Sequence, residues 1–385
     1  MNYPAYFDYN ATTPVDPAVL EAMLPYFGPH FGNAASRTHV FGSKAEEAVD
    51  EARQQLARLL GANSNEIVFT SGATESINLA LKGVFEANQH RASNRRSGHI
   101  ITVSTEHKAA LDTGEHLARH GAEITYLQPD SEGLITVKQV EDALKPETIL
   151  VSVMAANNET GVIQPIREIG AVARQHGALF HTDATQAVGK IPISFANTPV
   201  DLLSLSAHKF YGPKGVGALV ARKSLTLTAQ QDGGRHERGR RSGTLNVPGI
   251  VGLGEAARQA RLLLTNEQDT QRITALRDQL EAGIVSELST ATVNGNRRFR
   301  LPNTTNICFA GVDGELLLMS LNQIAVSNGS ACTSASTDPS HVLKAMGLSD
   351  DRAYSSVRFS LGRFTTEAEV DAAIRHVVAV VKRLH

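Results

Sequence analysis

Residues 178–209 read ALFHTDATQAVGKIPISFANTPVDLLSLSAHK, and this stretch decides the fold. Its two apolar runs, 178–182 and 201–205, predict β-strands, and polar residues come directly after each run. Similar short runs alternate with helical patterns at 66–70, 99–103, 123–127 and 148–153. Continuous apolar strands separated by helices indicate an α/β fold, in which helices cover both faces of a mostly parallel sheet.

The pattern changes from about residue 248. A long helical stretch to about 288 precedes two further predicted strands, 303–309 and 355–361, a helix from Asp313 and a terminal amphipathic helix. This order predicts a smaller α+β domain beside the large one. We place the large domain at residues 16–257 and the small domain at residues 1–15 and 258–385.

Composition limits the partners. The 385 residues are 42% hydrophobic and 20% charged, with a formal net charge of -2, so no global field attracts nucleic acid or anionic lipid. No apolar run reaches membrane-spanning length, and the first residues have no secretory pattern. The 2 cysteines fit a reducing compartment, so we expect a cytoplasmic protein that binds neither nucleic acid nor membrane.

Polar side chains stand at the positions where the predicted strands end. They are Ser71 to Thr74 after 66–70, His107 after 99–103, Asn158 after 148–153, Asp183 and Gln186 after 178–182, and Ser206, His208 and Lys209 after 201–205. In sheets of this kind ligands bind beyond the carboxyl ends of the strands. We therefore expect these side chains to share one site.

Their chemistry is that of a cofactor site. A glycine turn before a helix start, at Gly72, predicts a phosphate-binding cup, and His107 suits stacking or proton transfer. Asp183 ends an apolar strand and requires a cationic partner, such as a protonated pyridine nitrogen. Lys209 suits a Schiff base. Each feature alone also fits a helix cap, a turn, an internal ion pair or a surface lysine, but together they form the set that pyridoxal phosphate (PLP) requires.

The chain closely resembles the cysteine desulfurases of the NifS/IscS type, in the class-V aminotransferase family of PLP fold type I. The resemblance runs from DYNATTP at residues 8–14 to RFTT at 363–366. It includes the segments SGATES, STEHKA, NNETG, HTDATQAVGK, SAHKFYGPKG, GGRHERGRRSGT, GSACTS and VRFSLGR.

The resemblance implies a role for each matching residue. Lys209 would carry the cofactor, Asp183 would hold its ring nitrogen, and His107 would stack on the ring and move protons. The phosphate would be bound by Ala73, Thr74, Ser206 and His208. Gln186 would contact the ring oxygen, and the substrate would be held by Asn33, Asn158 and Arg358. Thr244 would reach the phosphate of a second subunit, which implies a homodimer.

The two cysteines differ in their surroundings. Cys308 lies in an alternating strand and is most simply a core residue. Cys332 lies in a run of small residues, about 327–337, that has little to pack, so we expect a mobile loop that carries a nucleophilic thiol. Arg358 lies inside a predicted strand, where its planar fork suits a carboxylate, whereas Arg363 comes after that strand and is expected to be solvated.

These features predict a cysteine desulfurase. It would convert L-cysteine to L-alanine, leave a persulfide on Cys332, and deliver the sulfur to an acceptor protein such as an iron–sulfur scaffold or a thiolation protein. Sulfur modification of DNA is a third destination for the sulfur. Another fold-type I enzyme, such as an aminotransferase or a selenocysteine lyase, would share Lys209 and Asp183, and a sulfur-relay scaffold without cofactor would need neither. His116 and His120 have no third ligand nearby in sequence, so no metal site is expected.

Overall fold

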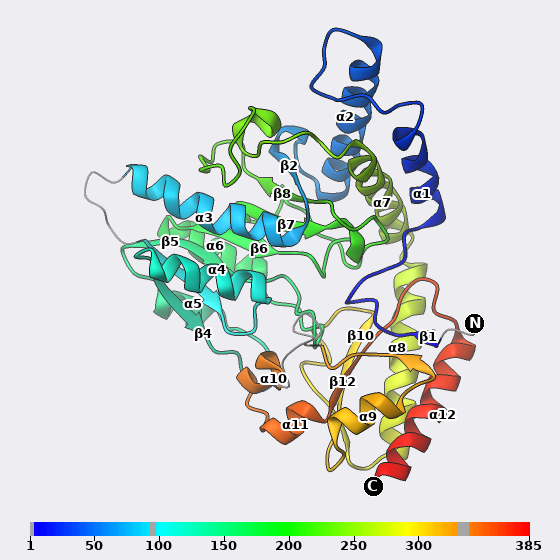
Figure 1. Cartoon of the computed structure of the whole chain (residues 1–385). Helices are drawn as coiled ribbons and strands as arrows, with labels where there is room; N and C mark the ends of the chain where they lie inside the picture. Colours follow the sequence, from blue (N-terminus) through cyan, green and yellow to red (C-terminus); the bar gives the residue numbers. More distant parts are fainter. Residues whose placement is uncertain (1–3, 92–97, 330–338) are drawn as a thin grey trace.

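A seven-stranded sheet forms the centre of the larger part of the protein (Figure 1). The computed structural model describes residues 4–91, 98–329 and 339–385. In spatial order the strands are β2 (Ile67–Thr70), β8 (Gly217–Ala221), β7 (Leu202–Ser206), β6 (Leu179–Asp183), β5 (Thr148–Ser152), β3 (His99–Val103) and β4 (Glu123–Leu127). All six strands predicted in this region are confirmed.

The strand β8 was not predicted from the sequence, and it is antiparallel to both neighbours, β2 and β7. Two reversals cancel, so β2 runs in the same direction as β7. The pairs from β7 through β6, β5 and β3 to β4 are parallel. The carboxyl ends of β2, β3, β5, β6 and β7 therefore meet at one edge of the sheet, as the sequence predicted.

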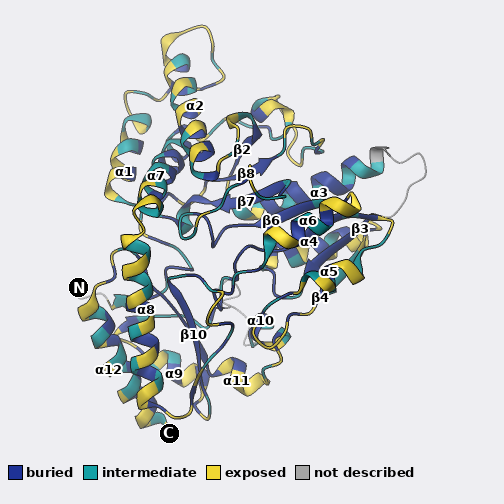
Figure 2. Cartoon of the chain, turned by 180° about the vertical axis from the view of Figure 1, so that it is seen from behind, coloured by how far each residue is buried: buried dark blue, intermediate teal, exposed yellow. Residues whose placement is uncertain are grey.

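Helices cover both faces of this sheet (Figure 2). One face packs against α2 (Val40–Leu60), α5 (Val137–Ala143), α6 (Ile166–His176) and α7 (Val247–Asn266), and the short α1 (Pro17–Met23) joins that layer. The other face packs against α3 (Ala73–Arg91) and α4 (Lys108–Arg119). Alternate residues of one strand serve the two layers, since Leu203 and Leu205 belong to the first core and Leu202 to the second.

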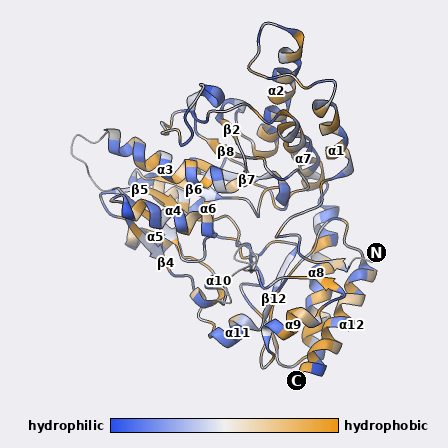
Figure 3. Ribbon diagram, viewed as in Figure 1, coloured by the Kyte–Doolittle hydropathy of each residue, from blue (hydrophilic) through white to orange (hydrophobic). Residues whose placement is uncertain are grey.

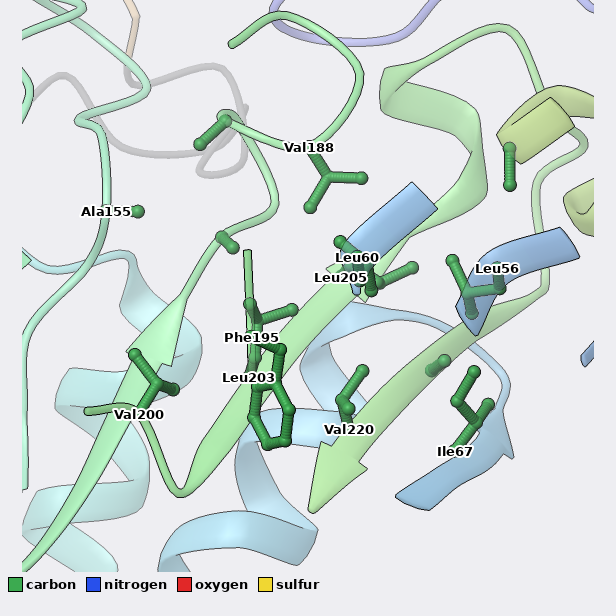
Figure 4. Close-up of a cluster of buried hydrophobic side chains, with 14 of the residues drawn as sticks. Leu56, Leu60, Ile67, Ala155, Val188, Phe195, Val200, Leu203, Leu205 and Val220 are labelled. Carbon is green, nitrogen blue, oxygen red and sulfur yellow. The ribbon is translucent and has the colours of Figure 1, made fainter. Parts of the chain in front are cut away.

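The first of these cores is closely packed (Figure 4). Leu56 and Leu60 of α2 lie with Leu203, Leu205 and other side chains that are fully buried. Where α2 crosses α7, a Cβ on Gly254 would lie 2.5 Å from the Cα of Ala52, so only glycine permits this approach. This packing holds the strands, and hence their carboxyl ends, in fixed positions.

His181 crosslinks the centre of the sheet. Its two ring nitrogens lie 2.8 Å from Ser152 Oγ on β5 and 2.9 Å from Ser204 Oγ on β7. Burial lowers the pKa of His181 to about 3, so the ring is neutral at physiological pH. The two serine hydroxyls and the imidazole thus form hydrogen bonds with one another. Because all three groups have partners, these polar residues are tolerated in the buried centre of the sheet.

A separate core supports the second sheet, which consists of β12 (Ser356–Ser360), β10 (Thr304–Phe309) and β9 (Ala291–Val293). This core joins Phe7 to side chains of α8 (Gln268–Glu287), α9 (Gly314–Ser320) and α12 (Glu367–Leu384) (Figure 3). The remaining elements of this part of the protein are a two-stranded pair and two short helices. The strands are β1 (Ala5–Tyr6) and β11 (Ile324–Ala325), and the helices are α10 (His341–Ala345) and α11 (Asp350–Tyr354).

The long helical stretch predicted from 248 to 288 is two helices. They meet at Glu267, whose φ of 51° ends α7 and precedes α8. Since α7 continues past residue 257, the proposed domain boundary lies within a helix and stays a prediction. In the part of the chain that the structure describes, no helix combines the length and apolarity needed to cross a membrane.

Short 3-10 turns link these elements: η1 (Leu24–Phe27), η2 (Ser64–Glu66), η3 (Ala207–Lys209) and η4 (His236–Gly239). The turn η4 is fastened to the sheet edge by Glu237, which forms a buried ion pair with Arg53 at 2.7 Å and accepts a hydrogen bond from Phe69 N–H. The basic segment around Arg238 is thus a structural loop beside β2.

Candidate active site

A cleft of about 580 Å³ opens at the carboxyl edge of the large sheet. It is bounded by the ends of β2, β3, β5, β6 and β7 and, from the second sheet, by β12. The cleft brings together these site residues predicted from the sequence: Ala73, Thr74, His107, Asn158, Asp183, Gln186, Ser206, His208, Lys209 and Arg358.

Lys209 lies in η3, immediately after β7. Its Nζ donates hydrogen bonds to the backbone oxygens of Asn10 at 2.6 Å and Ala11 at 2.7 Å. These acceptors come from the N-terminal segment, which passes across the mouth of the sheet. The amine is therefore directed toward the cleft by a segment nearly 200 residues earlier in the chain.

Asp183 ends β6 and is buried, with an exposed fraction of 5%. Its Oδ1 accepts a hydrogen bond from Thr185 N–H at 2.9 Å. A second carboxyl group, that of Glu106, is fully buried nearby and accepts from Met154 N–H at 2.6 Å. Burial, and then the charge of Asp183, raise the pKa of Glu106 well above its ordinary value. Of this buried pair of carboxyl groups, Glu106 is thus the one whose protonated form is favoured.

The end of β2 forms an anion-binding cup. Gly72 has a φ of 155°, and α3 begins at Ala73, so the N–H groups of its first turn are available to a ligand. Ser206 and His208 line the same cleft, and a Cβ on Gly72 would lie 3.6 Å from Ser206 Oγ. The pKa of His208 is lowered to about 4 by burial and then by Lys209, Lys214 and Lys190. Of these lysines, Lys209 and Lys214 line the same cleft as the cup.

His107 caps the N-terminus of α4, where its Nδ1 accepts a hydrogen bond from Ala109 N–H at 3.1 Å. Because Nδ1 uses its lone pair in this bond, the proton of the neutral ring lies on Nε2. The imidazole both ends the β3–α4 turn and lines the cleft, which combines the capping and ligand-facing interpretations that the sequence left open.

Arg358 lies on β12 and reaches the cleft from the second sheet. Its Nη2 donates to Asp8 Oδ1 at 2.6 Å and Ser327 Oγ at 2.9 Å, and its Nη1 donates to Asn158 O at 2.9 Å. Its Nε is buried without a partner among the described residues. The guanidinium is therefore held in place by three hydrogen bonds, while the N–H of its Nε is left without an acceptor among the described residues.

Arg363 is not solvated, so that expectation is wrong. Its Nη2 pairs with Asp16 Oδ2 at 2.6 Å, and its guanidinium lies 3.8 Å from the ring centroid of Tyr211. Tyr211 Oη also accepts from Arg363 N–H at 2.7 Å. These contacts join the loop after β12 to the turn that carries Lys209.

Two predicted residues among those that the structure describes are not brought to this cleft. Asn33 and Thr244 are exposed and do not line it. Cys332, with most of its predicted loop, lies outside the described residues, whereas Cys308 is fully buried in β10.

Sequence reasoning missed four residues that hold the site together: Asp8, Asn10, Glu106 and Lys190. All four lie inside or beside the quoted segments DYNATTP, STEHKA and HTDATQAVGK. Their polar character was visible, but their partners are distant in sequence, so their contacts were not.

Comparisons with known proteins agree with this geometry. The family described as aminotransferase class-V matches residues 5–373. The cysteine desulfurase IscS of Anaeromyxobacter dehalogenans is 56% identical over 100% of this chain and 94% of its own length. A solved structure named NifS-like protein superposes with a TM-score of 0.91 at 38% identity, covering 99% of this chain and 100% of that one. A structure described as SspA in complex with cysteine has a TM-score of 0.82 at 40% identity, covering 94% and 100% of the two chains.

The chain belongs to the class-V aminotransferase family. Within it, the full-length similarity identifies a cysteine desulfurase that uses PLP and acts on cysteine. The residues of the cleft fit that cofactor, since they offer an amine, a buried carboxylate and an anion cup. Two further polar atoms, Asn158 Oδ1 and Thr185 Oγ1, are buried without a partner among the described residues, as expected of a site built for a ligand.

We predict that Glu106→Gln makes the cofactor-free protein relatively more stable as pH rises. A raised pKa in the folded state means that folding keeps a proton that the unfolded chain loses above the ordinary glutamate pKa, so wild-type stability falls as pH rises through that window. Urea unfolding measures the free energy of unfolding of both proteins at pH 5 and at pH 8. The difference between the variant and wild type should change in favour of the variant by at least about 1 kcal/mol from pH 5 to pH 8. Glu21→Gln, at an exposed position, is the control, and parallel curves for Glu106→Gln and wild type would contradict the assignment.

Proposed function

We propose that the cleft is the cysteine-binding active site, with Lys209 holding the cofactor and Cys332 receiving the sulfur. The observation that carries this proposal is that the Lys209 amine and the buried Asp183 carboxylate line one cleft, together with an anion cup and Arg358. Bound PLP supplies a ring that accepts electrons from the α-carbon of the substrate.

The chain's own residues position and move the other groups. Asp183 would hold the protonated ring nitrogen, and the cup formed by Ala73, Thr74, Ser206 and His208 would hold the phosphate. Gln186 would donate a hydrogen bond to the ring oxygen. Arg358 and Asn158 bind the substrate carboxylate, because a guanidinium fork matches its two oxygens. Lys209, as the neutral amine, takes the α-proton.

Sulfur transfer then requires a thiolate. The thiolate of Cys332 attacks the substrate sulfur, so that an S–S bond forms and the C–S bond of cysteine breaks, leaving a persulfide and alanine. His107 lines the cleft and is suited to accept or return the thiol proton. Gly329 also lines the cleft and lies three residues before Cys332, and three residues span at most about 11 Å.

The persulfide passes to an acceptor protein, either an iron–sulfur scaffold or a thiolation protein, in the cytoplasm. Two separate hydrophobic cores support the division into a large domain (16–257) and a small domain (1–15 and 258–385).

We also propose a homodimer. Large apolar side chains are exposed along α1, η1 and the start of α2, which project from the sheet (Figures 1 and 3): Leu20, Leu24, Phe27, Phe31, Val40 and Phe41. Exposed large apolar side chains gathered in one segment are typical of a subunit interface. Asn33 lies within this segment, and Thr244 is exposed, so both are available to a second subunit.

Lys209 is predicted to be the residue that borohydride fixes to the cofactor. Reduction converts the imine to a stable amine, so digestion and mass spectrometry of the reduced holoenzyme should place the added cofactor mass on the peptide that contains Lys209. In Lys209→Ala, borohydride should bleach the cofactor absorbance without adding the cofactor mass to any peptide. Lys223→Met, at an exposed position after β8, should behave as wild type. A label on any other lysine would refute the assignment.

Cys332→Ser should keep the cofactor absorbance but lose persulfide formation, because serine has no thiol that could accept the sulfur of the substrate. The measurements are alanine release from cysteine under reducing conditions and alkylation of the persulfide. Cys308→Ala is the matched control, since that thiol is buried in β10, and it should still form the persulfide. Alanine release from Cys332→Ser at the wild-type rate would exclude the proposed role.

The dimer predicts that a charge in the apolar segment separates the subunits. Phe27→Glu and Phe41→Glu place carboxylates where an apolar surface would be buried, so sedimentation should show monomers for the double variant and dimers for wild type. Met319→Glu, on an exposed residue of α9, is the control. A monomeric wild-type protein at micromolar concentration would contradict the proposal.

A further inference from the structure

Lys190 lies four residues after Gln186, directly behind the cleft, and has no assigned role in the reaction. Its Nζ donates hydrogen bonds to Gln186 Oε1 at 2.6 Å and Asn10 Oδ1 at 3.0 Å. Burial, followed by the charges of Lys209 and Arg358, lowers the pKa of Lys190 well below its usual value. Around the small cavity that Lys190 also lines, the other charged side chains are Lys209, Asp269 and Arg363.

The contacts with Asn10 and Lys190 together determine which way the Gln186 amide points. A backbone carbonyl oxygen only accepts, so Nε2 of Gln186 faces Asn10 O, to which it donates at 2.9 Å, and Oε1 of Gln186 faces Lys190, which donates to it. If the amide were flipped, its NH₂ would face an amine and its oxygen would face a carbonyl oxygen. An amide nitrogen has two N–H groups, and only one is used by Asn10 O.

Asn10 connects this pair to Lys209. Its backbone oxygen accepts from both Gln186 Nε2 and Lys209 Nζ, and its side chain accepts from Lys190. Asn10 is itself fixed by the second sheet, because its N–H donates to Ser360 Oγ at 2.9 Å and its Nδ2 donates to Thr304 Oγ1 at 2.9 Å. Lys190, Gln186 and Lys209 therefore all donate to one rigidly held residue, Gln186 and Lys209 to its backbone oxygen and Lys190 to its side-chain oxygen.

We propose that Lys190 is a positioning residue that locks the Gln186 amide so that an N–H, rather than its oxygen, faces the ring oxygen of the cofactor. The inference rests on the proposed contact of Gln186 with that oxygen. A donated hydrogen bond stabilises the negative charge of the ring oxygen, which in turn lowers the pH at which the lysine-bound cofactor loses its proton. Without Lys190, the amide is able to turn its oxygen toward the ring.

The test is the pH titration of the visible absorption band of the holoenzyme, without substrate. Gln186→Ala and Lys190→Met should each raise the midpoint by about half a pH unit or more, because each removes the oriented donor. The double variant should show the shift of Gln186→Ala alone, since Lys190 acts through Gln186. Lys190→Arg still supplies a donor to Gln186 Oε1, and a guanidinium cannot accept, so its midpoint should stay at or below the wild-type value. Lys223→Met is the control at an exposed lysine.

The outcomes separate the two hypotheses. A shift in Gln186→Ala but not in Lys190→Met overturns the role of Lys190 and leaves the contact of Gln186 standing. No shift in either variant overturns the proposed contact itself. Additive shifts in the double variant also refute positioning through Gln186. Unfolding of the cofactor-free variants, measured against pH, gives a second readout: the lowered pKa makes wild-type stability rise with pH toward the usual lysine pKa, and this slope should be smaller in Lys190→Met.

Discussion

The active site depends on one geometric constraint: five strands end at the same edge of a sheet that is buried on both faces. Continuous apolar runs and their covering helices fix the strands, and each strand end delivers one to three of the predicted polar side chains to the cleft. The strand β8 does not disturb this. Because it is antiparallel to both β2 and β7, those two strands still run in the same direction. The rigid sheet, rather than the loops, sets the spacing between Asp183, Lys209 and the anion cup.

Much of this arrangement was predictable from the sequence, because it is local. A run such as DLLSLSAHK contains both the apolar strand and the polar residues at its carboxyl end, so the positions of Asp183, Ser206 and Lys209 were predicted correctly. The strand β8 was missed because its apolar run is short and lies beside Gly215 and Gly217, and the break at Glu267 was missed because no glycine or proline marks it.

Contacts between distant residues were not predictable in the same way. Arg363 was expected in solvent, but its partner Asp16 lies 347 positions away, and a single sequence gives no sign of such a pair. The same holds for Arg358 with Asp8 and for Lys190 with Asn10. In each case the residue type indicated that a partner was needed, and only the fold supplied its identity.

Asn10 and Asp8 have a further consequence for how the protein is made. The segment that holds the Lys209 amine is anchored to Ser360 and Arg358, 350 positions later. Domains generally fold during synthesis from the N-terminus onward. The large sheet is complete in sequence by residue 221, yet the segment that crosses its carboxyl edge has no anchor until the last strand has left the ribosome. A nascent chain therefore acquires its scaffold long before the two backbone oxygens that hold the Lys209 amine are fixed in place.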